Sequence, residues 1–120
     1  MDNRRLIKLA TLAGQIILES GGEIYRVEDT ITRILNSYAI KDAESFVTPT
    51  GIMVSLTDME GNIISLIRRV SKSTVDLEKV AMVNSLSREL MIMPLPLNEL
   101  EFKLHEILLN RALYQIFHEA

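Results

Sequence analysis

The spacing of apolar residues changes twice along this chain, and that change limits the folds it can adopt. Up to about residue 38, apolar residues recur every three or four positions, the spacing of a helix with one buried face. From about residue 44 to residue 70 they alternate with polar residues, as on strands, and after residue 76 the helical spacing returns. Because the strands are grouped and helices flank them, the sequence predicts an α+β domain with the order α-α-β-β-β-α-α and a small antiparallel sheet packed by helices.

Two helices are expected in the first third of the chain, separated by the Gly21-Gly22 pair, which breaks the pattern. The first, from about Asn3 to Ser20, is expected to bury Leu6, Leu9, Ala10, Ala13, Ile16 and Ile17. The second, from about Glu23 to Tyr38, is expected to bury Val27, Ile31, Ile34, Leu35 and Tyr38. The outward face of the second helix is expected to hold Arg26, Asp29, Thr30, Arg33 and Asn36.

The strand region begins at Glu44. Phe46 and Val47 open a short strand that Pro49 interrupts, which indicates an edge strand or a strand end. Beyond it, two runs of β-forming residues are separated by the turn sequence Asp58-Met59-Glu60-Gly61-Asn62. Residues 51–70 are therefore expected to form a hairpin with a Gly-containing loop.

Capping residues and prolines delimit the last two helices. Ser73 or Asp76 can cap the third helix, about Leu77 to Met91, and Pro94-Leu95-Pro96 ends it. The inner face of this helix is expected to hold Leu77, Val80, Ala81, Asn84, Leu86 or Ser87, and Leu90. Asn98 followed by Glu101 resembles a capping box, so a fourth helix is expected to start there and to run to about Phe117.

Composition narrows the class of protein further. The 120 residues match the size of one domain, and a hydrophobic content of 48% argues against disorder. The net charge of -3 argues against a nucleic-acid partner, and the lack of cysteine excludes disulfides and thiolate zinc sites. No window holds the ~20 mainly apolar residues of a membrane-spanning helix, so we expect one soluble domain over residues 1–120 that forms no pore.

The densest polar cluster runs from Glu19 to Asp29 around the two glycines. A helix N-terminus that follows the glycines would favour a carboxylate or phosphate group, with Arg26 as its clamp. The structural alternative is a corner between two helices, in which Glu23 favours the first helical turn and Arg26 pairs with Asp29. The sequence leaves both interpretations open. Because the glycines follow a helix and not a strand, they are neither a phosphate-binding loop nor a dinucleotide fingerprint.

Other polar groups could join this cluster. Thr48-Pro49-Thr50-Gly51 could line a pocket or only manage a bend, and one of Arg68 and Arg69 could turn toward the helices, because adjacent strand residues face opposite sides. Asn84, Ser87 and Arg88 share one face of the third helix. The candidate substrate-binding residues are Glu19, Glu23, Arg26, Glu28, Thr48, Thr50, Arg68, Arg69, Asn84 and Arg88.

The sequence leans away from catalysis. Its two histidines, His105 and His118, both lie in the last helix, far in sequence from Ser45, so no Ser-His-Asp set is indicated. Glu101 and His105 could supply two metal ligands, fewer than a site needs. We therefore assign no catalytic residue, and we predict no metal or other cofactor.

Several motifs occur in a fixed order along roughly residues 10–110: Ala13-Gly14, 18–23, 25–30, 44–52, Arg68-Arg69-Val70, 76–80 and 84–88. In this order they resemble the N-terminal domain of the threonine/serine exporter family. The resemblance implies a bacterial inner-membrane exporter whose hydrophilic cytoplasmic domain precedes a membrane region, in the same chain or in a partner subunit.

The resemblance implies threonine and serine as substrates, with succinate for related two-component members, and it suggests a hydrolase-like domain. The leading hypothesis is a regulatory, gating or assembly domain on the cytoplasmic side of the exporter. The alternatives are a module that binds a small amino acid or a dicarboxylate, and a hydrolase. Self-association is expected to use the apolar surface of the last helix, namely Phe102, Leu109, Leu113 and Phe117.

Overall fold

A computed structural model describes residues 2–71 and 74–118, with the side chains of 110–118 left aside. The seven elements follow the expected order, and the α+β class is confirmed. They are α1 Asn3–Glu19, α2 Ile24–Ser37, β1 Ala43–Thr48, β2 Gly51–Thr57, β3 Ile63–Arg69, α3 Leu77–Ile92 and α4 Leu97–His118. Among the described residues, no helix combines the length and the apolar character that crossing a bilayer requires.

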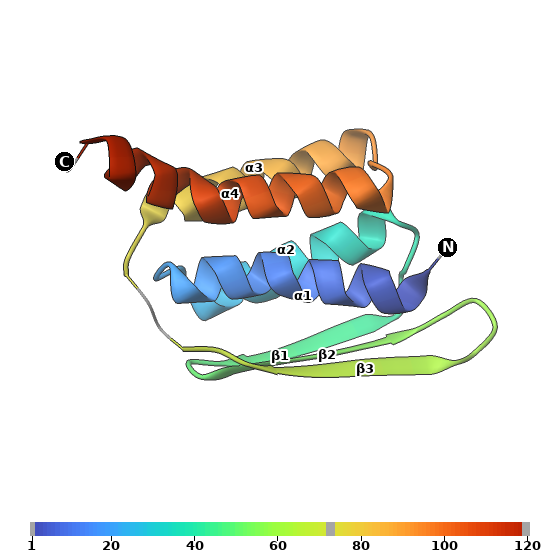
Figure 1. Ribbon diagram of the computed structural model, residues 1–120. Helices are drawn as coiled ribbons and strands as arrows, with labels where there is room; N and C mark the ends of the chain where they lie inside the picture. Colours follow the sequence, from blue (N-terminus) through green and yellow to red (C-terminus); the bar gives the residue numbers. More distant parts are fainter. Residues whose placement is uncertain (1, 72–73, 119–120) are drawn as a thin grey trace.

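The elements form three layers (Figure 1). The sheet is one outer layer, α1 and α2 form the middle layer, and α3 and α4 form the other outer layer. Helix α1 contacts α2, α3, α4, β2 and β3. The six residues of α1 that were expected to be buried are buried, and so are Ile7, Thr11, Gly14 and Leu18, because layers cover two sides of this helix.

The sheet has the order β1-β2-β3, and both pairs are antiparallel. The predicted hairpin over residues 51–70 is confirmed, and β1 is an edge strand as expected. The inner face of β2 packs on the helices through Ile52, Val54 and Leu56, which are buried. The outer face of the sheet leaves Phe46, Met53, Ile63 and Ile67 exposed.

Helices α1 and α2 both end in a left-handed residue. After α1, Gly22 N donates to Ile17 O at 2.8 Å and Gly21 N donates to Leu18 O at 3.2 Å, with Gly21 at φ +89. This is a Schellman motif, in which glycine is the preferred residue. After α2, Ile40 N donates to Leu35 O at 3.0 Å, but the left-handed residue is Ala39, at φ +67.

Helix α3 buries most of the face expected, since Val80, Leu86, Ser87 and Leu90 are buried, while Asn84 is only partly buried. Asp76 caps the helix by accepting a hydrogen bond from Lys79 N at 3.2 Å, whereas Ser73 lies outside the described residues. Leu77 and Ala81, which were expected to be buried, are exposed. Both line a hollow at the corner of the molecule, and the core contacts of α3 come from Val80, Val83, Leu86, Ser87 and Leu90.

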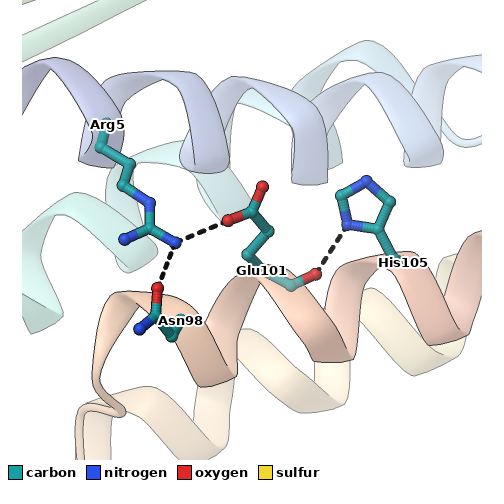
Figure 2. A network of polar contacts seen from close by, with 4 residues as sticks. All are labelled: Arg5, Asn98, Glu101 and His105. Atoms are coloured by element: carbon teal, nitrogen blue, oxygen red, sulfur yellow. Dashed lines mark hydrogen bonds and ion pairs between the residues drawn. The ribbon is translucent and has the colours of Figure 1, made fainter.

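Helix α4 begins one residue before the expected cap. Leu100 N donates to Pro96 O at 3.1 Å, so Asn98 lies inside the first turn and the predicted capping box is wrong. Instead, Arg5 Nη2 of α1 donates to Asn98 Oδ1 and to Glu101 Oε1, both at 2.6 Å (Figure 2). The hydrogen bond from Arg5 lowers the pKa of Glu101. This contact and the buried Leu100, Leu104 and Ile107 attach α4 to the other helices.

Replacing Ala39 by glycine should stabilise the protein by about 0.5–1 kcal/mol. A residue with a Cβ is destabilised by roughly 1–2 kcal/mol in the left-handed region, and glycine removes this strain. Part of the gain is lost, because glycine gives the unfolded chain more conformational entropy than alanine does. The matched control is Ala81→Gly, the same change at an exposed position inside α3, which should destabilise by about 1 kcal/mol. Urea denaturation of both variants measures the two signs. Destabilisation by Ala39→Gly would contradict the left-handed conformation at this residue.

Candidate functional site

Most of the predicted site residues gather at one end of the molecule. The turn between α1 and α2, the turn between β1 and β2, the end of β3 and the start of α3 all lie at this end (Figure 1). The chain supports this arrangement directly, because Asp76 N, before α3, donates to Ser20 O at the end of α1 at 2.9 Å. A site shared by these residues would therefore lie at this end.

A hollow of about 330 Å³ lies at the corner where the α1–α2 turn meets α3, and we call it the corner hollow. Three predicted site residues line it together: Glu23, Arg26 and Asn84. The other described residues that line it are Gly21, Gly22, Leu77, Val80 and Ala81. The corner hollow thus combines an acid, a base and an amide with an apolar wall.

The two glycines build this corner through their shape. A Cβ on Gly22 would lie 2.3 Å from Ile17 Cγ2, and a Cβ on Gly21 would lie 3.1 Å from Val75 Cγ2. Together with the Schellman hydrogen bonds, these close approaches account for both glycines. The structural interpretation of the glycine pair therefore holds, and the same turn places the N-terminus of α2 beside the corner hollow.

Glu23 and Arg26 differ in how they are held. Glu23 is the N-cap residue of α2, yet its side chain accepts no capping hydrogen bond and is exposed. The Glu23 side chain therefore does not compete with an anion for the first N–H groups of the helix. Arg26 is half-buried, with its guanidinium carbon 5.8 Å from the centre of the Tyr25 ring. A cation placed over an aromatic face is attracted to it and restricted in position.

Behind the corner hollow, α2 and α3 are joined by a polar contact that the sequence analysis missed. Arg33 Nη1 donates to Asn84 Oδ1 at 3.2 Å and to Ser87 Oγ at 2.9 Å. Arg33 was expected to point outward, and that prediction is wrong. The available signal was its position seven residues after Arg26, which places both arginines on one face of α2.

Thr30, between Arg26 and Arg33 on the same helix, was also expected to point outward. It is fully buried, and its Oγ1 has no hydrogen-bond partner within the described part of the chain. The α2 surface that faces α3 is therefore partly polar. A hydrophobic pattern cannot reveal such a surface, because a polar residue between two helices has the same place in the pattern as an exposed one.

The other predicted residues form separate contacts. Arg68 Nη1 donates to Gln15 Oε1 at 3.1 Å, and Gln15 Nε2 donates to Glu19 Oε1 at 2.8 Å, which links β3 to α1. Glu28 Oε2 accepts a hydrogen bond from Val47 N on β1 at 3.3 Å. One of the two adjacent arginines thus turns toward the helices, as expected, whereas Arg69 lies exposed on the outer face of the sheet.

Thr48 and Thr50 serve the turn between β1 and β2, where Thr50 N donates to Thr48 Oγ1 at 3.3 Å. Neither threonine lines the corner hollow, and neither does Arg68. Arg88 lies exposed on α3. The structure therefore brings together Glu23, Arg26 and Asn84, and it places the remaining candidates in neighbouring contacts at or near the same end.

A second, larger hollow of about 540 Å³ lies between α2 and the sheet. Its charged residues are Glu28, Asp29 and Glu44, all acidic, and its walls include Phe46 and Met53. A carboxylate ligand would be repelled there by like charges. For the ligands that the sequence analysis considered, the corner hollow is the better candidate.

Metal binding and the Ser-His pairing considered for hydrolysis each require side chains that lie close together. The described residues contain no group of three His, Asp or Glu side chains placed to hold a metal ion. His105 lies on α4, in the layer farthest from Ser45 on β1, and its Nδ1 donates to Glu101 O at 2.9 Å (Figure 2). The hydrolase hypothesis gains no support from this arrangement.

Replacing Arg33 by alanine should destabilise the protein by about 1.5–3 kcal/mol. The substitution removes two hydrogen bonds from a charged donor and leaves Asn84 Oδ1 and Ser87 Oγ short of a donor in a half-buried contact. Arg88→Ala is the matched control, since its side chain is exposed, and it should change stability by less than ~0.5 kcal/mol. Chemical denaturation measures both. Equal stabilities of the two variants would show that the contact between α2 and α3 does not hold the helices together.

Comparison with known protein families places this chain in one of them. A family model described as "Putative threonine/serine exporter" matches residues 8–118, nearly the whole chain. No curated protein and no solved structure matches the chain. Because the family model covers far more than half of the sequence, this chain belongs to the threonine/serine exporter family.

Proposed function

We propose that this chain is a regulatory domain of a threonine/serine exporter, and that it senses the exported amino acid in the corner hollow. In this proposal the domain lies on the cytoplasmic side of the membrane and acts on the exporter's membrane region, in the same chain or in a partner subunit. The family assignment supports the link to export. The chemistry of the corner hollow supports the sensing role.

The observation that carries the proposal is the presence of one acid and one base in a single small hollow. Threonine and serine carry a carboxylate and an ammonium group one carbon apart. Arg26 and the N-terminus of α2 suit the carboxylate, because a guanidinium and free helical N–H groups both bind anions. Glu23 suits the ammonium group, and the Asn84 amide can hydrogen-bond to a side-chain hydroxyl.

The size and the apolar wall of the corner hollow agree with a small ligand. Its volume of about 330 Å³ is near the lower end of the range of roughly 300–1,000 Å³ for small-molecule sites. Leu77, Val80 and Ala81 offer an apolar surface for the methyl group of threonine. A larger solute would extend beyond these walls into solvent.

The same charges argue against a dicarboxylate. Among the described residues that line the corner hollow, Arg26 is the only base, and Glu23 is an acid. A second carboxylate would therefore find like charge where the ammonium group of an amino acid finds opposite charge. Succinate should bind more weakly than threonine at this site.

The position of the corner hollow between two helices suggests how binding could regulate export. A ligand held by Glu23 and Arg26 on α2 and by Asn84 on α3 favours one arrangement of these helices over others. Helix α3 is joined to α4 through the segment 93–96, and Leu95 O accepts a hydrogen bond from Tyr38 at the end of α2. A change in α3 would therefore reach α4 through a short connection.

Isothermal titration calorimetry of the 120-residue chain tests the proposal with threonine, serine and succinate. Threonine and serine should give saturable heat, and succinate should bind at least tenfold more weakly. Arg26→Ala should weaken threonine binding at least tenfold, because it removes the charge that faces the ligand carboxylate. Arg88→Ala, an exposed arginine outside the corner hollow, should leave the affinity unchanged.

Two results would oppose the proposal. Absence of heat at millimolar threonine with the unaltered chain would remove the sensing role. If Arg26→Ala weakens threonine binding no more than Arg88→Ala does, any binding site lies outside the corner hollow.

A further inference from the structure

Strand β3 presents an unpaired edge. It is the last strand of the sheet order, and Val70 N, directly after it, donates to Thr50 O at 3.0 Å. In an antiparallel ladder the residues that bond to the neighbouring strand alternate with residues whose N–H and C=O point away. By the observed register, the backbone groups of Ile63, Ser65, Ile67 and Arg69 therefore point away from β2.

The two edges of the sheet differ in how they are covered. At the β1 edge, α2 packs against the strand and Glu28 accepts the hydrogen bond of Val47 N. At the β3 edge, α1 packs over the strand, but among the described residues no element hydrogen-bonds to the outward backbone groups of β3. Figure 1 shows β3 along the open side of the sheet.

The side chains on this edge are also unusual for an open strand. Ile63 and Ile67 are 72% and 70% exposed. Ile67 lies opposite Met53, which lies opposite Phe46, so a row of exposed apolar side chains crosses all three strands. Natural sheets usually protect an open edge with a proline, a bulge, a central charge or a very short strand. β3 has seven residues in an unbroken register, and its two charges stand together at its end.

We propose that β3 pairs with β3 of a second copy of this chain, in antiparallel orientation, to form one continuous six-stranded sheet. The sequence of β3 is complementary to itself when Ser65 of the two copies lie opposite each other. In that register, Ile63 of each copy lies opposite Ile67 of the other, on the same outer face. Arg68 and Arg69 of the two copies then lie at opposite ends of the paired strands, where their charges repel least.

Other registers fit less well. Centring the pair on Leu66 places Ile63 opposite Arg69 and Ser65 opposite Ile67. Centring it on Ile67 places Arg69 opposite Ser65 and leaves Ile63 opposite Ser71. With Ser65 at the centre, the row of Phe46, Met53 and Ile67 continues into Ile63 of the second copy, so the apolar face becomes continuous across the dimer. Cross-strand pairs of this kind stabilise a sheet.

This interface differs from the one predicted on α4. Phe102 and Leu109 of that predicted surface are exposed, whereas Leu113 and Phe117 lie outside the described side chains. α4 also lies in the layer farthest from the sheet, so the two interfaces cannot be the same. Ligand sensing in the corner hollow does not enter the argument for the β3 interface, and the two can fail separately.

Sedimentation equilibrium of the 120-residue chain over a range of concentrations tests the proposal. We expect a reversible monomer–dimer equilibrium. Ile67→Lys should weaken the dimer at least tenfold, because it places a charge opposite Ile63 of the second copy, close to the centre of the paired strands. The matched control is Ile92→Lys, an equally drastic change at an exposed position near the end of α3, and it should leave the equilibrium unchanged.

A backbone variant tests the strand pairing itself. Ser65→Pro removes an N–H that points away from β2, so it should prevent pairing with the second copy while leaving the internal ladder intact. Its circular dichroism spectrum should match that of the unaltered chain. Because the chain has no cysteine, Ser65→Cys should also be cross-linked to a dimer by a short bismaleimide, and Ile92→Cys should not.

Each outcome decides for or against the β3 interface. A chain that stays monomeric at all concentrations overturns the proposal. So does a dimer that Ile67→Lys and a folded Ser65→Pro leave intact, since that dimer would use another surface, such as α4. If Ser65→Pro does not fold, Ile67→Lys and the cross-linking of Ser65→Cys still give the answer.

Discussion

The position of α1 between two layers is the constraint on which the rest of this structure depends. Ten of its 17 residues are buried, because the sheet packs on one side and α3 and α4 pack on the other. A helix so enclosed must end sharply, since the chain has to turn back within the same layer. The Schellman motif at Gly21 and Gly22 makes that turn. The turn then places the start of α2 beside α3. The corner hollow follows from this geometry.

How much the sequence could reveal depended on whether a feature is local. The helices and the hairpin follow from periodicity and turn residues, which act within a few positions, and these predictions are confirmed. The burial of Ile7 and Leu18 could not be predicted, because a one-faced pattern does not anticipate a second packed layer. Asn98 was assigned as a cap because its partner, Arg5, is 93 residues away in the chain and cannot be inferred from local motifs.

In the candidate site, too, local features could be predicted from the sequence, whereas features set by the packing of distant segments could not. Glu23 and Arg26 are close in sequence, so their joint position at the start of α2 was within reach of the sequence analysis. Asn84 was identified as polar, but its place in the corner hollow depends on how α3 packs against α2. Arg33 and Thr30 were assigned to the wrong side of α2, because a polar contact between two helices looks like an exposed face in the sequence.

The central claim is that the corner hollow binds the exported amino acid, and amide chemical shifts test it most directly. In a titration of the ¹⁵N-labelled chain with threonine, we predict saturable shifts of the Gly21, Gly22 and Ile24 amides. The amides of Gly51 and Gly61, in the turns of the sheet, should stay in place and serve as internal controls. Shifts centred on Gly51, or a spectrum that threonine leaves unchanged, would contradict the account.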